Sequence, residues 1–174
     1  MAALGRAVEA VARSLSRQQA ADGEGATTLI TCAVSGADDD ADARAAARAV
    51  VSSDLLKAAV HGADPNWGRI AMAVGNALVA PADILEAAGL DPATARERAG
   101  QPVELAPDSL QIDIEGTPVF AGLPLEYDEA ALSERMREGE VTIRVDLGVG
   151  EGVGEAYGCD LSQEYVIENS EYST

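Results

Sequence analysis

The chain has 174 residues, with 30 acidic residues against 12 basic ones and a formal net charge of −18. This length fits one domain spanning residues 1–174, because domains usually run to about 100–200 residues. The excess of acid would repel phosphate backbones and anionic lipid surfaces, so we expect no nucleic acid and no membrane as partner. No apolar run approaches the roughly 20 residues that a membrane-spanning helix requires.

The two cysteines, Cys32 and Cys159, are too few for a disulfide framework. No signal peptide is visible either, so we expect a reducing, cytoplasmic setting. We predict no metal site, because His61 and the two cysteines are the only soft ligands and none are spaced as pairs. The acidic run at residues 38–42 lacks the glycine and glutamate that a calcium-binding loop needs.

The N-terminal segment predicts a helix over residues 1–20. Four apolar residues recur on one face of this helix: Leu4, Val8, Val11 and Leu15. No capping residue precedes them, so we expect the chain to begin inside an element, with something missing before it. A turn at 21–25 is followed by residues 27–34, whose β-forming side chains predict a strand.

The middle of the chain predicts helices over 40–51 and 54–60. The loop 61–66 follows, and Asn66 is a good N-cap for a helix over 67–78. The remaining predictions, in chain order, are a short helix at 82–88, strands at 109–114 and 118–120, a helix at 128–137, strands at 140–147 and 155–160, and a helix at 162–168. Strands and helices mix without regular alternation, which indicates an α+β layered fold.

Glycines at 148, 150, 152 and 154 do not form a dinucleotide-binding fingerprint, because their spacing is wrong and no helix follows them. A hairpin between two strands is the better interpretation. His61 could belong to a hydrolase triad, but no G-x-S-x-G motif presents a serine, and a structural role is favoured. Arg69 could hold a carboxylate, or it could form a structural ion pair.

Three polar residues remain as candidates for binding a ligand. Glu24 lies between Gly23 and Gly25, which allow a close approach of backbone or ligand, so its carboxylate could receive an ammonium group; a solvated turn acid is the alternative. Asn169 and Thr174 end the chain, where fraying is the usual expectation. The residues alone therefore provide no complete catalytic set.

From His61 to Arg69 the sequence reads HGADPNWGR. With this motif, the chain resembles the C-terminal (β-chain) part of the glutamate N-acetyltransferase / ornithine acetyltransferase family of arginine biosynthesis. The matching segments are 22–27, 53–57, 61–69, 145–148, 158–162 and 165–174. The resemblance implies a layered α/β sandwich of the ornithine acetyltransferase, N-terminal-nucleophile-like type, of which this chain holds the C-terminal part only.

The resemblance also implies a reaction. In this family an autocatalytic cleavage frees a threonine, which takes acetyl from N-acetylornithine as an acyl-enzyme and passes it to glutamate, releasing ornithine. Some members also use acetyl-CoA as donor, and no other cofactor is implied. Glu24, Asn169 and Thr174 are the implied substrate-binding residues. The first threonine here, Thr27, lies inside a predicted strand, so we assign no catalytic residue to this chain.

The nucleophile and the oxyanion-hole donors would therefore lie on the N-terminal α portion, which is the expected partner in an assembly of two α and two β chains. Alone, the chain should be inactive and should expose an apolar face where that portion docks. The alternative is a non-catalytic remnant that binds amino acids or serves as an interaction domain. A hydrolase of the same architecture, such as an aminopeptidase, is a weaker third interpretation. Residues 79–108 also look longer than the usual connection in the family, which predicts a surface insertion.

Overall fold

The computed structural model describes residues 2–171, which form a five-stranded mixed sheet with helices around it. The strands are β1 (Leu29–Ala37), β2 (Gln111–Ile114), β3 (Thr117–Ala121), β4 (Glu140–Asp146) and β5 (Gly152–Cys159). Their order across the sheet is β3-β2-β4-β1-β5. Only β1 and β4 run parallel; the other neighbours are antiparallel. A parallel pair needs a long crossover, and most of the helices lie in the segment between these two strands.

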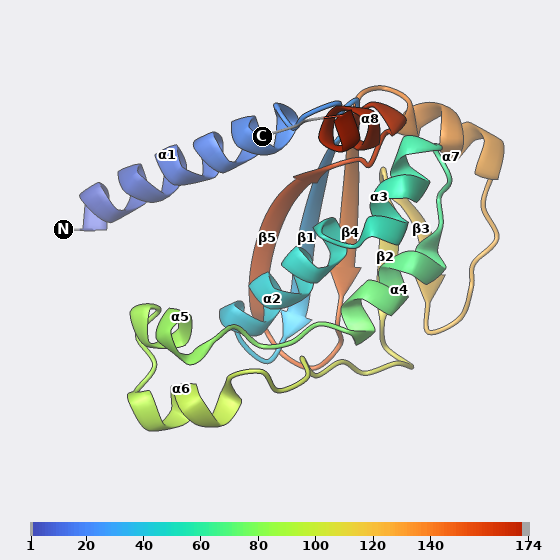
Figure 1. Cartoon of the computed structure of the whole chain (residues 1–174). Helices are drawn as coiled ribbons and strands as arrows, with labels where there is room; N and C mark the ends of the chain where they lie inside the picture. Colours follow the sequence, from blue (N-terminus) through green and yellow to red (C-terminus); the bar gives the residue numbers. More distant parts are fainter. Residues whose placement is uncertain (1, 172–174) are drawn as a thin grey trace.

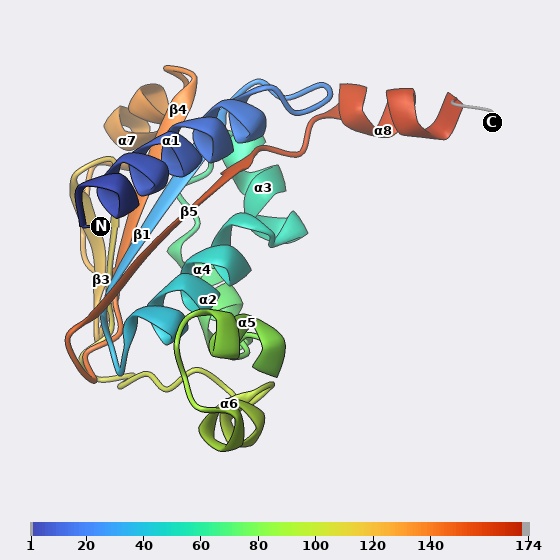
Figure 2. The ribbon, with the colours of Figure 1, turned by 90° about the vertical axis from the view of Figure 1, so that its left-hand side faces the viewer.

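The helices are α1 (Ala2–Ala21), α2 (Asp40–Val51), α3 (Asp54–His61), α4 (Trp67–Gly75), α5 (Ala82–Ala87), α6 (Pro92–Arg98), α7 (Glu129–Met136) and α8 (Gln163–Glu171). Helices α2, α3 and α4 cover one face of the sheet, and α5 and α6 lie beyond its lower end (Figure 1). Helices α1 and α8 leave the upper end in different directions (Figure 2).

Most predicted elements are present, and three differences from the expectation have a clear physical reason. Helix α4 ends at Gly75, because Asn76 already acts as its C-cap. Strand β5 begins at Gly152, so the glycine run is partly strand, and the predicted hairpin is wrong because β1 lies between β4 and β5 in the sheet. Helix α6 was not predicted, although Asp91 caps it and Pro92 occupies its first turn, a standard start signal.

The hydrophobic core lies between the sheet and α2, α3 and α4. Alternate residues of β1 point into it, and each faces a buried residue of β4 in register: Ile30 opposite Val141, Cys32 opposite Ile143, and Val34 opposite Val145. Helix α2 contributes mainly small side chains to this core, namely Ala43, Ala46 and Ala47, with Val50. Small side chains let the helix backbone approach the sheet closely.

Glycines of β5 permit the closest of these approaches. A Cβ atom on Gly154 would lie 2.4 Å from the backbone nitrogen of Arg44, and one on Gly158 would lie 2.8 Å from the carbonyl oxygen of Val51. Side chains alternate along a strand, so the helix-facing positions of β5 are Gly152, Gly154, Ala156 and Gly158. The glycine-rich stretch therefore exists because α2 lies directly on the backbone of β5.

Helix α1 buries none of its predicted apolar face. Leu4, Val8, Val11 and Leu15 are 58–66% exposed, and α1 is held to the sheet by ion pairs from Arg13 to Glu155 and from Arg17 to Glu140. The chain thus carries an exposed apolar stripe, as expected. None of the described helices combines the length and the apolar composition needed to cross a bilayer.

Replacing Gly154 with alanine tests the contact between β5 and α2. We expect Gly154→Ala to lower the free energy of unfolding by about 1–3 kcal/mol, because the added methyl group overlaps the backbone of α2. Gly75→Ala is the matched control, since a Cβ there meets nothing within 4 Å. Urea denaturation of both variants measures the difference. Equal midpoints for the two variants would contradict the close packing.

Candidate functional site

The turn that contains Glu24 lies against the beginning of α8. Gly25 has a φ of +62°, and a Cβ on it would lie 2.6 Å from the backbone nitrogen of Tyr165. The hydroxyl of Ser162 donates to the carbonyl oxygen of Gly25 at 2.6 Å and accepts from the Tyr165 N–H at 3.1 Å. On the other side of Glu24, a Cβ on Gly23 would lie 2.7 Å from the Sγ atom of Cys159. Both glycines are therefore required by close contacts, and together they fix the position of Glu24.

Glu24 and Asn169 meet in the structure, although 145 residues separate them. The Nδ2 atom of Asn169 donates to the Oε2 atom of Glu24 at 3.1 Å and to the carbonyl oxygen of Tyr165 at 2.9 Å. Both side chains are exposed. Neither Oε1 of Glu24 nor Oδ1 of Asn169 has a hydrogen-bond partner among the described residues. These two acceptors are therefore available to a ligand that carries N–H donors.

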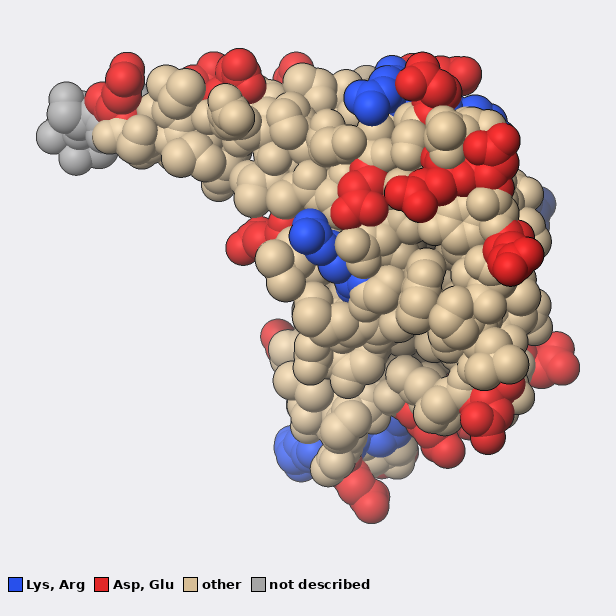
Figure 3. Space-filling view, turned by 90° about the vertical axis from the view of Figure 1, so that its right-hand side faces the viewer, with Lys and Arg blue, Asp and Glu red and all other residues tan. Residues whose placement is uncertain are grey.

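The third predicted residue, Thr174, lies outside the described residues 2–171. Around the pair, acidic side chains gather along the upper part of the molecule, including the projecting helix α8 (Figure 3). An ammonium group is therefore favoured over a free anion at this end of the molecule.

A buried carboxylate lies beneath this site. The Oδ1 atom of Asp160 accepts from the backbone N–H groups of Thr27 at 2.8 Å and Thr28 at 3.0 Å. Its Oδ2 atom accepts from the Thr27 hydroxyl at 2.6 Å and from Nδ1 of His61 at 2.7 Å. Burial alone would raise the pKa of Asp160, but the hydrogen bonds from Thr27, His61 and Thr28 outweigh it and hold the pKa below its ordinary value.

This network gives His61 a structural contact, as favoured from the sequence, and it engages the Thr27 hydroxyl with Asp160. The Thr27 hydroxyl donates to the carboxylate of Asp160. The Nδ1 atom of His61 lies 3.5 Å from this hydroxyl, and the same nitrogen is hydrogen-bonded to Asp160. In a histidine-activated nucleophile, the hydroxyl would instead face the free nitrogen of the ring. The outer edge of His61 remains accessible, since its side chain is 34% exposed.

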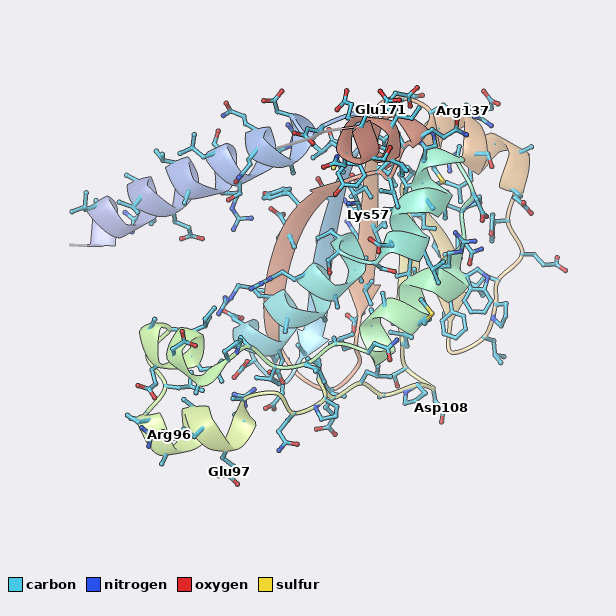
Figure 4. All side chains as sticks on the ribbon, viewed as in Figure 1. Lys57, Arg96, Glu97, Asp108, Arg137 and Glu171 are labelled. Carbon is cyan, nitrogen blue, oxygen red and sulfur yellow. The ribbon has the colours of Figure 1, made fainter. Side chains whose placement is uncertain are left out.

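Lys57 lies at the same end of the molecule, and we did not single it out from the sequence. It precedes His61 by four residues on α3, so the two side chains share a helix face. The N–H of Leu161 donates to the carbonyl oxygen of Lys57 at 3.3 Å, and Figure 4 shows Lys57 between α3 and α8. This lysine makes no ion pair with any residue that the structure describes. The spacing of four residues between Lys57 and His61 was the sequence signal that could have indicated their shared helix face.

The loop from Asp64 to Arg69 has an internal structural role. The side chain of Asn66 caps α4 by accepting from the Arg69 N–H at 3.1 Å, and it donates to Asp64 at 3.1 Å. The guanidinium of Arg69 donates to the carbonyl oxygen of Leu55 at 2.5 Å. Among the described residues, the partner of Arg69 is thus a backbone carbonyl and not a carboxylate.

The aromatic residue of the same loop fixes it to the edge of the sheet. Trp67 stacks on Phe120 of β3 with ring centroids 4.9 Å apart, and the hydroxyl of Tyr127 donates to the carbonyl oxygen of Pro65 at 3.3 Å. The loop therefore holds α4 against β3 and also supports α3. Among residues 2–171, no three His, Cys, Asp or Glu side chains are grouped so that they could hold a metal ion.

Replacing Asp160 with asparagine tests the buried network. At pH 7 we expect Asp160→Asn to lower the free energy of unfolding by roughly 3 kcal/mol, because a charged acceptor is removed from buried donors. The folded-state pKa of Asp160 is depressed, so its contribution is complete above the ordinary aspartate pKa of about 3.9 and is lost as pH falls through the lower folded value. The variant should lack this acid-dependent loss. Urea denaturation between pH 7 and pH 2.5 measures both effects.

Asp22→Asn is the control for this experiment, because Asp22 is exposed and its side chain makes no hydrogen bond with the described residues. An Asp160→Asn variant that is as stable as the control at pH 7 would show that the network does not hold the fold.

Comparison with known proteins places this arrangement in a family. A model described as the ArgJ family matches residues 1–174. The arginine biosynthesis bifunctional protein ArgJ of Deinococcus radiodurans is 51% identical over 168 residues, which cover 97% of this chain and 37% of that protein. A glutamate N-acetyltransferase of Methanopyrus kandleri is 41% identical, over 97% of this chain and 38% of that protein. The chain thus spans less than two fifths of the length of these curated relatives.

A solved structure agrees with the sequence comparison. The crystal structure of arginine biosynthesis bifunctional protein ArgJ from Bacillus halodurans is similar to this structure with a TM-score of 0.79 and 32% sequence identity, over 98% of this chain and 70% of that chain. The predicted α+β sandwich class is therefore confirmed. On these matches, the chain belongs to the ArgJ family.

Proposed function

We propose that this chain is the C-terminal portion of an acetyltransferase of arginine biosynthesis, which transfers acetyl from N-acetylornithine to glutamate. Its relatives carry the names of the bifunctional ArgJ protein and of glutamate N-acetyltransferase. The observation that carries the proposal is the contact between Glu24 and Asn169, two residues expected to bind substrate from distant parts of the sequence. Acetyl-CoA is a second acetyl donor in this proposal.

The exposed pair suits the chemistry of both amino-acid substrates. N-acetylornithine carries a side-chain ammonium, and glutamate carries an α-ammonium. The free oxygen of Glu24 can accept a charge-assisted hydrogen bond from either group. The amide of Asn169 can accept from an ammonium or donate to a carboxylate. We assign Thr174 to the same site, where its hydroxyl can donate or accept a hydrogen bond.

In this proposal, the groups that attack and transfer the acetyl group lie outside this chain. In this proposal the threonine nucleophile and the donors that stabilise the oxyanion belong to the remaining three fifths of the sequence, in an assembly of two α and two β chains. The exposed apolar stripe of α1 supports the presence of such a partner, because water would otherwise contact Leu4, Val8, Val11 and Leu15.

One observation favours a second function, a non-catalytic protein that binds amino acids. Thr27 is the only threonine hydroxyl in the described network of the site, and it is bonded to Asp160 instead of to a base. The same Glu24–Asn169 pair would then bind an amino acid without turning it over.

The test is to combine the chain with the N-terminal portion and to measure acetyl transfer from N-acetylornithine to glutamate. We expect activity in the mixture, and a fall in kcat/KM of roughly tenfold to a hundredfold for Glu24→Gln, as expected when one charged hydrogen bond to substrate is lost. Asn169→Ala should act in the same direction. Glu168→Gln is the matched control, because Glu168 is an exposed acid on α8 without a described hydrogen bond.

Wild-type kinetics for Glu24→Gln in an active complex would show that Glu24 does not bind substrate. If the mixture is inactive while calorimetry shows the isolated chain binding N-acetylornithine, the amino-acid-binding function is the correct one.

A further inference from the structure

A second concave site lies between α2 and the segment from Asn76 to Gly100, which contains α5 and α6. The cavity has a volume of about 630 Å³. This volume falls within the range of about 300–1,000 Å³ that small-molecule sites occupy. One wall is formed by residues of α2, and the opposite wall by Leu78, Ile84 and their neighbours. Figures 1 and 2 both show α5 beside α2, at the opposite end of the molecule from α8.

The walls of this cavity are held in place at two points. Two hydrogen bonds join the start of the segment to its end. The N–H of Val79 donates to the carbonyl oxygen of Gln101 at 2.8 Å, and the N–H of Val103 donates to the carbonyl oxygen of Ala77 at 2.9 Å. At its far end, the guanidinium of Arg98 on α6 is paired with the carboxylates that begin α2: Asp39 at 2.5 Å and Asp42 at 2.6 Å. The two ends of the segment are therefore joined to each other, and its far end is tied to the start of α2 through Arg98.

Two cations without a protein partner line the cavity. Arg44 and Arg48 are four residues apart on α2 and lie on one face. Neither guanidinium makes a hydrogen bond or an ion pair with a described residue, and none of the described residues lining the cavity is acidic. Both arginines also border a neighbouring hollow, whose lining includes Glu9, Asp40 and Glu155, so acidic groups lie on the other side of them. An anion bound between the two guanidiniums could form charge-assisted hydrogen bonds with both.

The rest of the lining is apolar and open to solvent. Leu78 is 58% exposed and Ile84 is 47% exposed, although both face the cavity. Opposite them lie Ala45 and Ala49, whose small side chains leave the space empty. A ligand with an apolar body would cover these side chains and gain the free energy of their burial.

We propose that this cavity binds a small amphipathic organic anion, with its carboxylate or phosphate between Arg44 and Arg48 and its apolar body against Leu78 and Ile84. Neither residue of the Glu24–Asn169 pair lines it, so this site does not depend on the proposed transferase function. The two arginines select a ligand with an anionic head group, and the volume of the cavity limits the size of its apolar part.

The experiment is an isothermal titration of the full chain with octanoate and with octyl phosphate. We expect saturable binding of at least one of these anions in a one-to-one ratio, and the tighter of the two identifies the preferred head group. Octyltrimethylammonium has the same chain with the opposite charge, and it should bind at least roughly tenfold more weakly. The absence of saturable binding for both anions would overturn the proposal.

Variants then locate the binding. The double variant Arg44→Gln, Arg48→Gln should weaken anion binding by roughly tenfold or more, because the charged contacts are lost. Arg96→Gln is the control, since Arg96 lies on α6 without lining the cavity (Figure 4), and it should bind as the wild type does. Ala45→Phe should reduce binding without any change of charge, by filling the cavity.

Amphiphiles could also associate with the apolar stripe of α1, so Val11→Ser serves as a further control. We expect Val11→Ser to leave the affinity unchanged. Unchanged affinity in the double arginine variant, or a loss in Val11→Ser as large as in that variant, would refute the assignment of the site. Far-UV circular dichroism of each variant confirms that it is folded.

Discussion

The buried carboxylate of Asp160 is the interaction on which this end of the molecule depends. It joins the end of β5 to the start of β1 through Thr27 and Thr28, and it joins both strands to α3 through His61. A buried charge is tolerated only when its hydrogen-bonding capacity is filled, and here every bond comes from a different backbone or side-chain donor. The turn with Glu24 lies just before this network in the sequence, and α8 lies just after it. The network thus holds the segments from which both start, and the contacts of Gly25 with Ser162 and Tyr165 then place the turn against α8.

The layer between the sheet and α2 depends on a close approach of two backbones. Glycine and alanine at the helix-facing positions of β5, together with the alanines of α2, bring two backbones into direct contact. Close packing of this kind leaves no room for larger side chains at the helix-facing positions. The cavity beside Arg44 and Arg48 lies next to this layer, and its outer wall is held near α2 by the ion pairs of Arg98.

Local patterns were sufficient to predict most elements of the fold. Alternation in 140–147 predicted β4, and the Asn66 cap predicted the start of α4. The pattern failed where packing decided the outcome. Residues 152–154 read as a turn, because nothing in a run of glycines shows that a helix lies on it. Helix α6 was missed because its alanine- and proline-rich composition concealed a valid cap at Asp91.

The sequence by itself determined the composition of the site: a carboxylate between two glycines, and an amide near the C-terminus. It also determined the apolar stripe of α1, because helical periodicity is a local property. Only the tertiary structure decided that Glu24 meets Asn169, that Asp160 lies beneath them, and that Arg44 and Arg48 line a cavity without a partner. The physical reason is that these contacts join segments far apart along the chain. Their geometry depends on strand order and on how α2, α3 and α8 are placed around the sheet, which no local pattern contains.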